Sequence, residues 1–183
     1  MRTSAATSVG PYTWSSQQIP DLAGRTAVVT GASSSLGLQV TQTLAEHGAT
    51  VVMAVRNTDK GEAARQRLTG LGIGPNQLQV LRLDLMDLSS VRLLAQQLSD
   101  QLPALDLLIA NGGISSQPHQ LSAQGLESQV ATNHVGHFAL TGLLLGLLEA
   151  GHDPRVVTVA SALYRRARLD GWCLSPRGAA SAS

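Results

Sequence analysis

A glycine-containing stretch near the amino terminus, residues 30–37 with the sequence TGASSSLG, constrains the fold more than any other part of the chain. It joins an apolar run, residues 26–29, to an amphipathic segment that starts near Leu36. A strand, a tight turn and a helix are therefore expected in succession. Unpaired N–H groups at the start of a helix, together with the helix dipole, hold phosphate groups. Because Gly31 permits the turn and Gly37 lets the helix lie close to the strand, the stretch predicts a phosphate-binding turn.

The rest of the chain alternates between strand and helix patterns. Residues 50–55 are continuously apolar, which is typical of a strand buried on both faces and hence of a parallel sheet between helices. The alternation predicts a Rossmann-type, doubly wound α/β fold of three layers, α/β/α, with ligands at the carboxyl ends of its strands. The predicted strands are residues 25–30, 50–55, 78–83, 105–110 and 155–160, and the predicted helices run from 36 to a glycine cap at 48, then over 58–71, 87–102 and 126–149. Thr58 or Asp59 is expected to cap the second helix.

Three parts of the chain differ in pattern. Residues 1–20 are rich in Ser, Thr and Gln and predict a flexible N-terminal arm. Residues 21–169 carry the alternation and predict one dinucleotide-binding Rossmann domain, and residues 170–183 follow neither period and predict an irregular tail.

Composition excludes several classes of function. A formal net charge of +1 with scattered arginines argues against a nucleic-acid surface. No apolar run approaches the roughly 18 residues of a membrane span, and residues 1–20 lack the apolar core of a signal peptide. Cys173 is the lone cysteine, so an internal disulfide and a cysteine-based zinc site are excluded. These observations predict a cytoplasmic protein without a membrane span.

A glycine turn alone is compatible with other classes of protein. A Walker phosphate loop is excluded because no Gly-Lys-Ser/Thr occurs, and Lys60, the single lysine, is expected away from the catalytic site. A purely structural turn and a methyltransferase turn remain alternatives at this point. Later stretches decide between them.

Five stretches occur in order: residues 30–37, Asp84-Leu85 after the third strand, ANGG at 110–113, TNHVGHF at 132–138 and VTVAS at 157–161. Together they resemble the short-chain dehydrogenase/reductase family, most closely its retinol-dehydrogenase-like members, through about residue 170. One departure lies in the turn, where Ser35 stands in place of the family's middle glycine.

The resemblance implies a nicotinamide dinucleotide as cofactor and assigns residues to the site. Asp84 falls on the residue that contacts the adenine amine, Asn133 on the active-site asparagine and Ser161 on the catalytic serine. The implied cofactor-binding residues are Gly31, Ser33, Ser34, Ser35, Leu36, Gly37, Arg56, Asp84, Leu85, Asn111, Gly112 and Gly113.

The end of the second strand indicates which dinucleotide is bound. An acidic residue there would hydrogen-bond the ribose 2′-OH of NAD, whereas an arginine accommodates the 2′-phosphate of NADP. The chain has Val55-Arg56-Asn57 and no acid at this place, so NADP(H) is favoured over NAD(H) with Arg56 as the phosphate partner. The alternative is that Arg56 is simply an exposed turn residue.

The family interconverts alcohols and carbonyl compounds by hydride transfer, with a tyrosine exchanging the proton and a lysine four residues later lowering the pKa of that tyrosine. This chain has no Tyr-x-x-x-Lys. Tyr164 and Arg168 give Tyr-x-x-x-Arg, but they follow Ser161 too closely, and Tyr164 is expected to be a loop residue. The chain is therefore predicted to be catalytically impaired, as a truncated or frame-shifted product.

Two further patterns are weighed. His134 and His137 have a spacing found in metal sites, but no third ligand accompanies them, and no metal is expected. The leucine-rich segment 140–148 is either core or the interface of a homo-oligomer. Without later strands, the fifth strand is expected to be a hydrophobic edge that lowers stability and promotes association.

Two functions therefore remain. The first is an NADP-preferring oxidoreductase acting on a small alcohol or carbonyl substrate. The second is a non-catalytic NADP(H)-binding or interaction module, or a nonfunctional truncated product.

Overall fold

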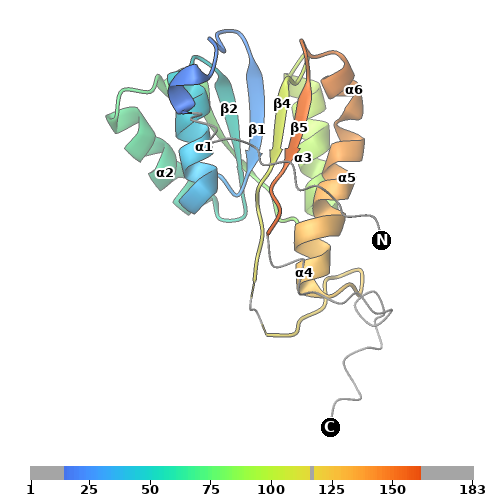
Figure 1. Ribbon diagram of the computed structural model, residues 1–183. Helices are drawn as coiled ribbons and strands as arrows, with labels where there is room; N and C mark the ends of the chain where they lie inside the picture. Colours follow the sequence, from blue (N-terminus) through green and yellow to red (C-terminus); the bar gives the residue numbers. More distant parts are fainter. Residues whose placement is uncertain (1–14, 116–117, 162–183) are drawn as a thin grey trace, which may run out of the picture.

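The computed structural model describes residues 15–115 and 118–161 and contains a five-stranded parallel sheet (Figure 1). The strand order is β3-β2-β1-β4-β5. The two halves of the doubly wound sheet, β3-β2-β1 and β4-β5, therefore meet between β1 and β4. The predicted fold class is confirmed. The strands are β1 (Thr26–Thr30), β2 (Thr50–Val55), β3 (Leu78–Arg82), β4 (Leu107–Ala110) and β5 (Arg155–Thr158).

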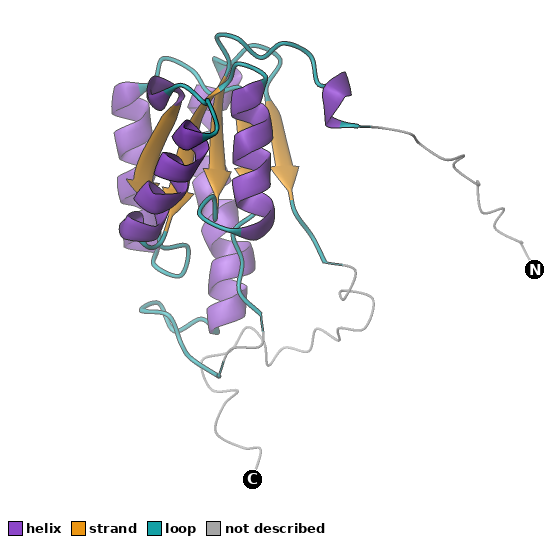
Figure 2. Cartoon of the chain, turned by 90° about the vertical axis from the view of Figure 1, so that its left-hand side faces the viewer, coloured by secondary structure: helices purple, strands orange, loops and turns teal. Residues whose placement is uncertain are grey.

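Helices cover both faces of the sheet, as Figures 1 and 2 show. The helices α1 and α2 lie on one face, and α3, α5 and α6 lie on the other (Figure 1). Their bounds are α1 (Ser35–Glu46), α2 (Thr58–Gly70), α3 (Leu88–Gln101), α4 (Ser128–Val130), α5 (Gly136–Leu143) and α6 (Leu145–Glu149).

Successive residues of β1 point into two different cores. Val28 packs with α3 and α5 residues such as Leu94 and Leu140, whereas Val29 packs with α1 and α2 residues such as Leu44 and Leu68. Because side chains alternate across a strand, a strand between two helical layers must be apolar at every position. This explains the uninterrupted apolar run of β2 as well.

The cap of α2 differs from the expectation. Asn57, and neither Thr58 nor Asp59, is the N-cap, and its Oδ1 accepts the backbone N–H of Lys60 at 2.9 Å. Asn57 has the extended backbone, with φ of −109° and ψ of 109°, from which a short polar side chain reaches the third N–H of a helix.

The predicted single helix over residues 126–149 is wrong in two respects. It begins two residues later, because the carbonyl of Leu126 accepts the N–H of Ser122 and Glu127 caps α4 through the N–H groups of Gln129 and Val130. It is also interrupted by a π-helical turn, Ala131–Val135, and again at Leu144, between α5 and α6.

The leucine-rich segment belongs mainly to the core. Leu140, Leu144 and Leu148 are buried against α3 and the sheet, whereas Leu143 and Leu145 are about half exposed. A single face of the segment is therefore available to a partner.

The edge position predicted for the fifth strand is confirmed. Within the described residues β5 pairs only with β4, and Val156 and Val157 are 44% and 46% exposed. Residues 15–20 of the predicted arm include a short 3₁₀ turn, Ser16–Gln18. The rest of the arm and the tail over 170–183 lie outside the described residues, so those predictions stand untested. None of the helices within 15–115 and 118–161 has the length and apolar character to cross a membrane.

Candidate cofactor-binding site

The glycine turn has the geometry that the spacing predicts. Gly31 has a φ of +68°, which a residue with a side chain adopts only at a cost. A Cβ at Gly37 would lie 2.3 Å from the carbonyl oxygen of Gly31, so a glycine is required where α1 passes the end of β1. The first N–H groups of α1 are thereby held next to the turn without intrahelical acceptors, as anion binding requires.

A hydroxyl group links this turn to the end of β4. The Thr30 Oγ accepts the N–H of Asn111 at 3.0 Å and that of Gly112 at 2.8 Å. The Asn111 side chain in turn donates from Nδ2 to the Thr30 carbonyl at 3.0 Å. These bonds form because β1 and β4 are neighbours in the sheet and end together. Asn111 therefore holds two strand ends together and does not line the cavity described next.

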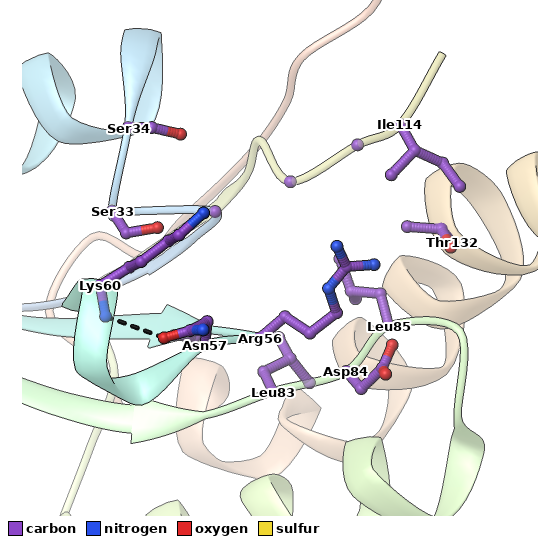
Figure 3. A pocket seen from close by; sticks show the side chains of 14 residues that line it. Ser33, Ser34, Arg56, Asn57, Lys60, Leu83, Asp84, Leu85, Ile114 and Thr132 are labelled. Atoms are coloured by element: carbon purple, nitrogen blue, oxygen red, sulfur yellow. Dashed lines mark hydrogen bonds between the residues drawn. The ribbon is translucent and has the colours of Figure 1, made fainter. Parts of the chain in front are cut away.

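A cavity of about 360 Å³ opens at this carboxyl edge of the sheet (Figure 3). It lies where the ends of β1, β2, β3 and β4 converge, which is where doubly wound sheets bind ligands. The residues that line it are Gly31, Ser33, Ser34, Ala54, Arg56, Asn57, Lys60, Leu83, Asp84, Leu85, Gly112, Gly113, Ile114 and Thr132.

Two cations dominate the charge of this cavity. Arg56 follows β2 and Lys60 lies in the first turn of α2, and both side chains extend over the cavity in Figure 3. Both residues are exposed, and within the described part of the chain neither forms an ion pair. Asp84 is the one acid among the lining residues. The end of the cavity beside β2 and α2 is thus suited to an anionic group.

Lys60 is a lining residue that the sequence did not predict. The sequence places it away from the catalytic residues, and the structure brings it, with Arg56 and Ser33, into the cavity, which Asn133 and Ser161 do not line. Its position three residues after the N-cap Asn57, on the turn of α2 that faces the sheet edge, was the available signal.

Asp84 is held in place by its own neighbours. Its N–H donates to the Ser90 hydroxyl at 2.8 Å, and its Oδ1 accepts the N–H of Met86 at 3.0 Å. The carboxylate therefore has a fixed orientation while it lines the cavity beside the buried Leu85.

Asn133 lies next to the cavity without lining it. Its Oδ1 accepts the N–H of Ile114 and its Nδ2 donates to the carbonyl of the same residue, both at 2.8 Å. A Cβ at Gly113 would lie 3.2 Å from Asn133 Oδ1, so the segment after β4 runs directly past this amide. Ser161 is exposed beyond the end of β5 and does not line the cavity. Tyr164 and Arg168 lie outside the described residues.

His134 and His137 lie in different environments. His134 is exposed and its ring stacks on Phe138 at a centroid distance of 6.5 Å, whereas His137 is 7% exposed. In the portion of the chain that the structure describes, no three His, Cys, Asp or Glu side chains are grouped as a metal would require.

The structure thus gathers eight of the residues implied by the resemblance around one cavity, whereas Ser35, Leu36, Gly37 and Asn111 do not line it. Lining residues that the sequence did not single out are Ala54, Asn57, Lys60, Leu83, Ile114 and Thr132. Three of them, Ala54, Asn57 and Leu83, lie within two residues of the end of β2 or β3, which is the signal that could have found them.

Comparison with known proteins decides the family. The family model for short chain dehydrogenases matches residues 25–171, which is most of the chain. The chain belongs to this family.

Two curated relatives of this short chain dehydrogenase resemble it over most of its length. Retinol dehydrogenase 14 of Mus musculus is 41% identical over 156 residues, covering 80% of this chain and 47% of the relative. Dehydrogenase/reductase SDR family member 13 of Homo sapiens is 47% identical over 150 residues, covering 82% of this chain and 39% of the relative. The chain therefore spans less than half the length of these relatives.

A solved structure of the family gives the same fold. A short chain dehydrogenase from Escherichia coli CFT073, solved in complex with NADPH, superposes with a TM-score of 0.70 at 29% identity. The match covers 81% of this chain and 63% of that one.

Proposed function

We propose that the chain forms the cofactor-binding half of an NADP(H)-dependent oxidoreductase that interconverts alcohols and carbonyl compounds. The observation that carries this proposal is the pair Arg56 and Lys60, two cations on the cavity at the end of β2 that form no ion pair with any residue the structure describes. The sequence has no acid in the position that would bind a ribose 2′-OH. A 2′-phosphate satisfies both cations, whereas NAD(H) would leave them without an anion.

The residues present fit a dinucleotide. The close approach at Gly31 and Gly37 leaves the backbone N–H groups of the turn open to a pyrophosphate. Arg56 and Lys60 would hold the 2′-phosphate, and the oriented carboxylate of Asp84 would accept from the adenine amine. When bound, the nicotinamide supplies or accepts the hydride.

The proton-transferring half of the reaction sets the limit of the proposal. Asn133 and Ser161 are the proposed catalytic residues that this sequence contains, with Ser161 orienting the substrate oxygen. The 183 residues hold no Tyr-x-x-x-Lys, so no side chain at the family's position can exchange the substrate proton. We infer that this chain binds NADP(H) but turns over substrate poorly.

That same absence favours a second candidate, a non-catalytic NADP(H)-binding or interaction module. A cytoplasmic location and a homo-oligomer remain part of the proposal, supported by the lone Cys173 and by the half-exposed Leu143 and Leu145. A small alcohol or carbonyl compound is the proposed substrate class, on the family's chemistry.

Fluorescence titration with NADPH and NADH, run beside an NADPH-oxidation assay on a panel of carbonyl compounds, tests the proposal. We expect NADPH to bind at least tenfold more tightly than NADH. Arg56→Gln and Lys60→Gln should each weaken NADPH binding by about tenfold and leave NADH binding unchanged, because each removes one charge-assisted contact. Arg67→Gln, which removes an exposed charge from α2 away from the cavity, is the matched control.

The outcomes separate the candidates. Binding of NADPH without turnover supports the non-catalytic module, and binding with turnover supports the enzyme. Equal affinities for the two dinucleotides, or no loss in either variant, would contradict the assignment of Arg56 and Lys60.

A further inference from the structure

A buried histidine lies beside the proposed site without a role in it. His137 is in the first turn of α5, one turn after Asn133, and only 7% of it is exposed. An imidazole ring carries two nitrogens that need partners when they are buried. Both have partners here, and the pattern of those partners fixes the state of the ring.

The first partner is the Thr30 hydroxyl, whose Oγ lies 2.8 Å from His137 Nε2. This oxygen already accepts two backbone N–H groups, from Asn111 and Gly112. The hydroxyl hydrogen of Thr30 is therefore still available for donation. The His137 ring nitrogen at 2.8 Å is a better acceptor than the Ile109 carbonyl at 3.4 Å, so Thr30 donates to Nε2.

The second partner is the carbonyl of Asn133, 3.3 Å from His137 Nδ1. A carbonyl accepts only, so Nδ1 must carry the hydrogen. The two contacts together require a neutral ring in the Nδ1–H tautomer. A second hydrogen at Nε2 would point at an oxygen whose lone pairs are both in use.

These bonds close a circuit through three separate segments of the chain. The Thr30 hydroxyl accepts a backbone N–H after β4, and further along the same segment the Ile114 N–H donates to the Asn133 amide. The Asn133 carbonyl is hydrogen-bonded to His137, which is in turn hydrogen-bonded to Thr30. The circuit surrounds the turn that carries Gly112 and Gly113 into the cavity.

We propose that neutral His137 is a positioning residue, which holds the Asn133 turn against the end of β1 and so fixes the segment after β4 on the cavity. The ring acts through Thr30 and Asn133 and does not itself line the cavity. The use of cofactor affinity as one readout rests on the proposed function, whereas the state of the ring does not.

We expect low pH to break this circuit of hydrogen bonds. Burial lowers the pKa of His137, and the hydrogen bond to the Asn133 carbonyl offsets this only in part. The titratable groups on neighbouring elements are Arg92 and Asp100 on α3, His134 in the π-helical turn and Glu149 on α6, whereas β1 and β4 carry none. Among the described residues no charged group contributes to the lowered pKa of His137, so none of the acids placed by the structure stabilises an imidazolium there.

The sign of the effect follows from this pKa. The unfolded chain takes up a proton near pH ~6.5, whereas the folded chain does so only at a lower pH. The stability that neutral His137 contributes is therefore complete above about pH 6.5 and is lost as the pH falls toward the lowered folded value.

Long-range ¹H–¹⁵N NMR of the full chain labelled at histidine tests the tautomer directly. At pH 7 we expect a hydrogen on Nδ1 of His137 and none on Nε2, with the signals assigned by their absence in a His137→Gln variant. An Nε2–H tautomer or a doubly protonated ring would overturn the proposal. This outcome does not depend on whether the protein binds NADPH.

Two variants test the positioning. His137→Phe keeps the size and removes both hydrogen bonds, and we expect it to weaken NADPH binding by about tenfold. His137→Gln can both accept and donate but does not titrate, so binding should return to within about threefold of the parent protein, and the loss of affinity between pH 7 and pH 5 should shrink. His134→Gln, at the exposed neighbouring histidine, is the control.

Equal behaviour of His137→Phe and His137→Gln, or an unchanged acid response in His137→Gln, would reject the positioning role. If the parent protein binds no NADPH, the proposed function fails. The acid response of the thermal unfolding midpoint, compared between the parent protein and His137→Gln, then decides the role of His137 by itself.

Discussion

Ser35 is held in a backbone conformation that side chains disfavour. Its φ is +47°, and among the described residues other than glycine only Asp153, at +48°, shares a positive φ. The family has a glycine at this place, and the structure gives the physical reason: the chain must turn through the left-handed region to start α1. The serine adopts it at a cost of about 1–2 kcal/mol.

Replacing Ser35 with glycine should therefore stabilise the protein. We expect Ser35→Gly to raise the free energy of unfolding by about 0.5–1 kcal/mol, since relief of the strained φ exceeds the entropy that glycine adds to the unfolded chain. Urea unfolding measures this as a higher midpoint with the same slope. Ser34→Gly is the control, because Ser34 has an extended φ of −157° and its side chain makes no capping bond. An equal gain in both variants would contradict the explanation.

At the scale of elements, the amino ends of the strands are tied by one buried carboxylate. Asp106, directly before β4, accepts the Thr26 N–H at 2.7 Å, the His152 N–H at 2.8 Å and the Arg25 guanidinium at 3.2 Å. It thereby joins the start of β1 to the loop that leads into β5. This end of the sheet lies opposite the cavity, so its role is to stabilise the fold.

Asp106→Asn should cost about 2–3 kcal/mol of unfolding free energy, because an amide NH₂ would face N–H donors that now have a carboxylate as acceptor. Asp153→Asn is the matched control. Its ion pair with Arg155 joins two side chains that are both more than half exposed, and its loss should cost less than about 0.5 kcal/mol. Chemical denaturation of the two variants provides the comparison. A loss of unfolding free energy below about 1 kcal/mol in Asp106→Asn would contradict the stabilising role of Asp106.

At the scale of the whole molecule, the sheet is protected at one edge more than at the other. The faces of β1, β2 and β4 are covered by helices, whereas every residue of β5 is exposed, with Val156 and Val157 on opposite faces. An apolar strand with a free edge is a template for pairing with another chain.

This chain expressed alone should therefore self-associate through β5. We expect sedimentation velocity at increasing concentration to show growing oligomers for the parent sequence and fewer for Val157→Lys, because a charge on an edge strand opposes pairing. Leu93→Lys removes a more exposed apolar side chain, 70% accessible on α3, and should have little effect. A parent chain that stays monomeric at all concentrations would refute the expectation.

The sequence by itself determined the order and type of the elements. Strand and helix periods, the glycine turn and the absence of an acid after β2 are local properties, because each depends on residues within a few positions of one another. The parallel sheet and the places of Gly31 and Arg56 on the cavity followed from that local information. The place of Asp84 and the edge position of β5 followed from the resemblance to the family. The boundaries near Leu126 and the cap Asn57 did not, since they depend on which of several neighbouring polar groups forms the better hydrogen bond.

Only the tertiary structure decided what the local pattern leaves open. Lys60 reaches the cavity because α2 packs on the same sheet edge as the glycine turn, and Ser35 is strained because the path from β1 into α1 is fixed by the contact of Gly37 with Gly31. His137 is neutral and buried because Thr30, 107 residues away in sequence, presents its hydroxyl to the ring. These features depend on the distances between segments that are remote along the chain, and such distances are set when the whole sheet and its helices pack together.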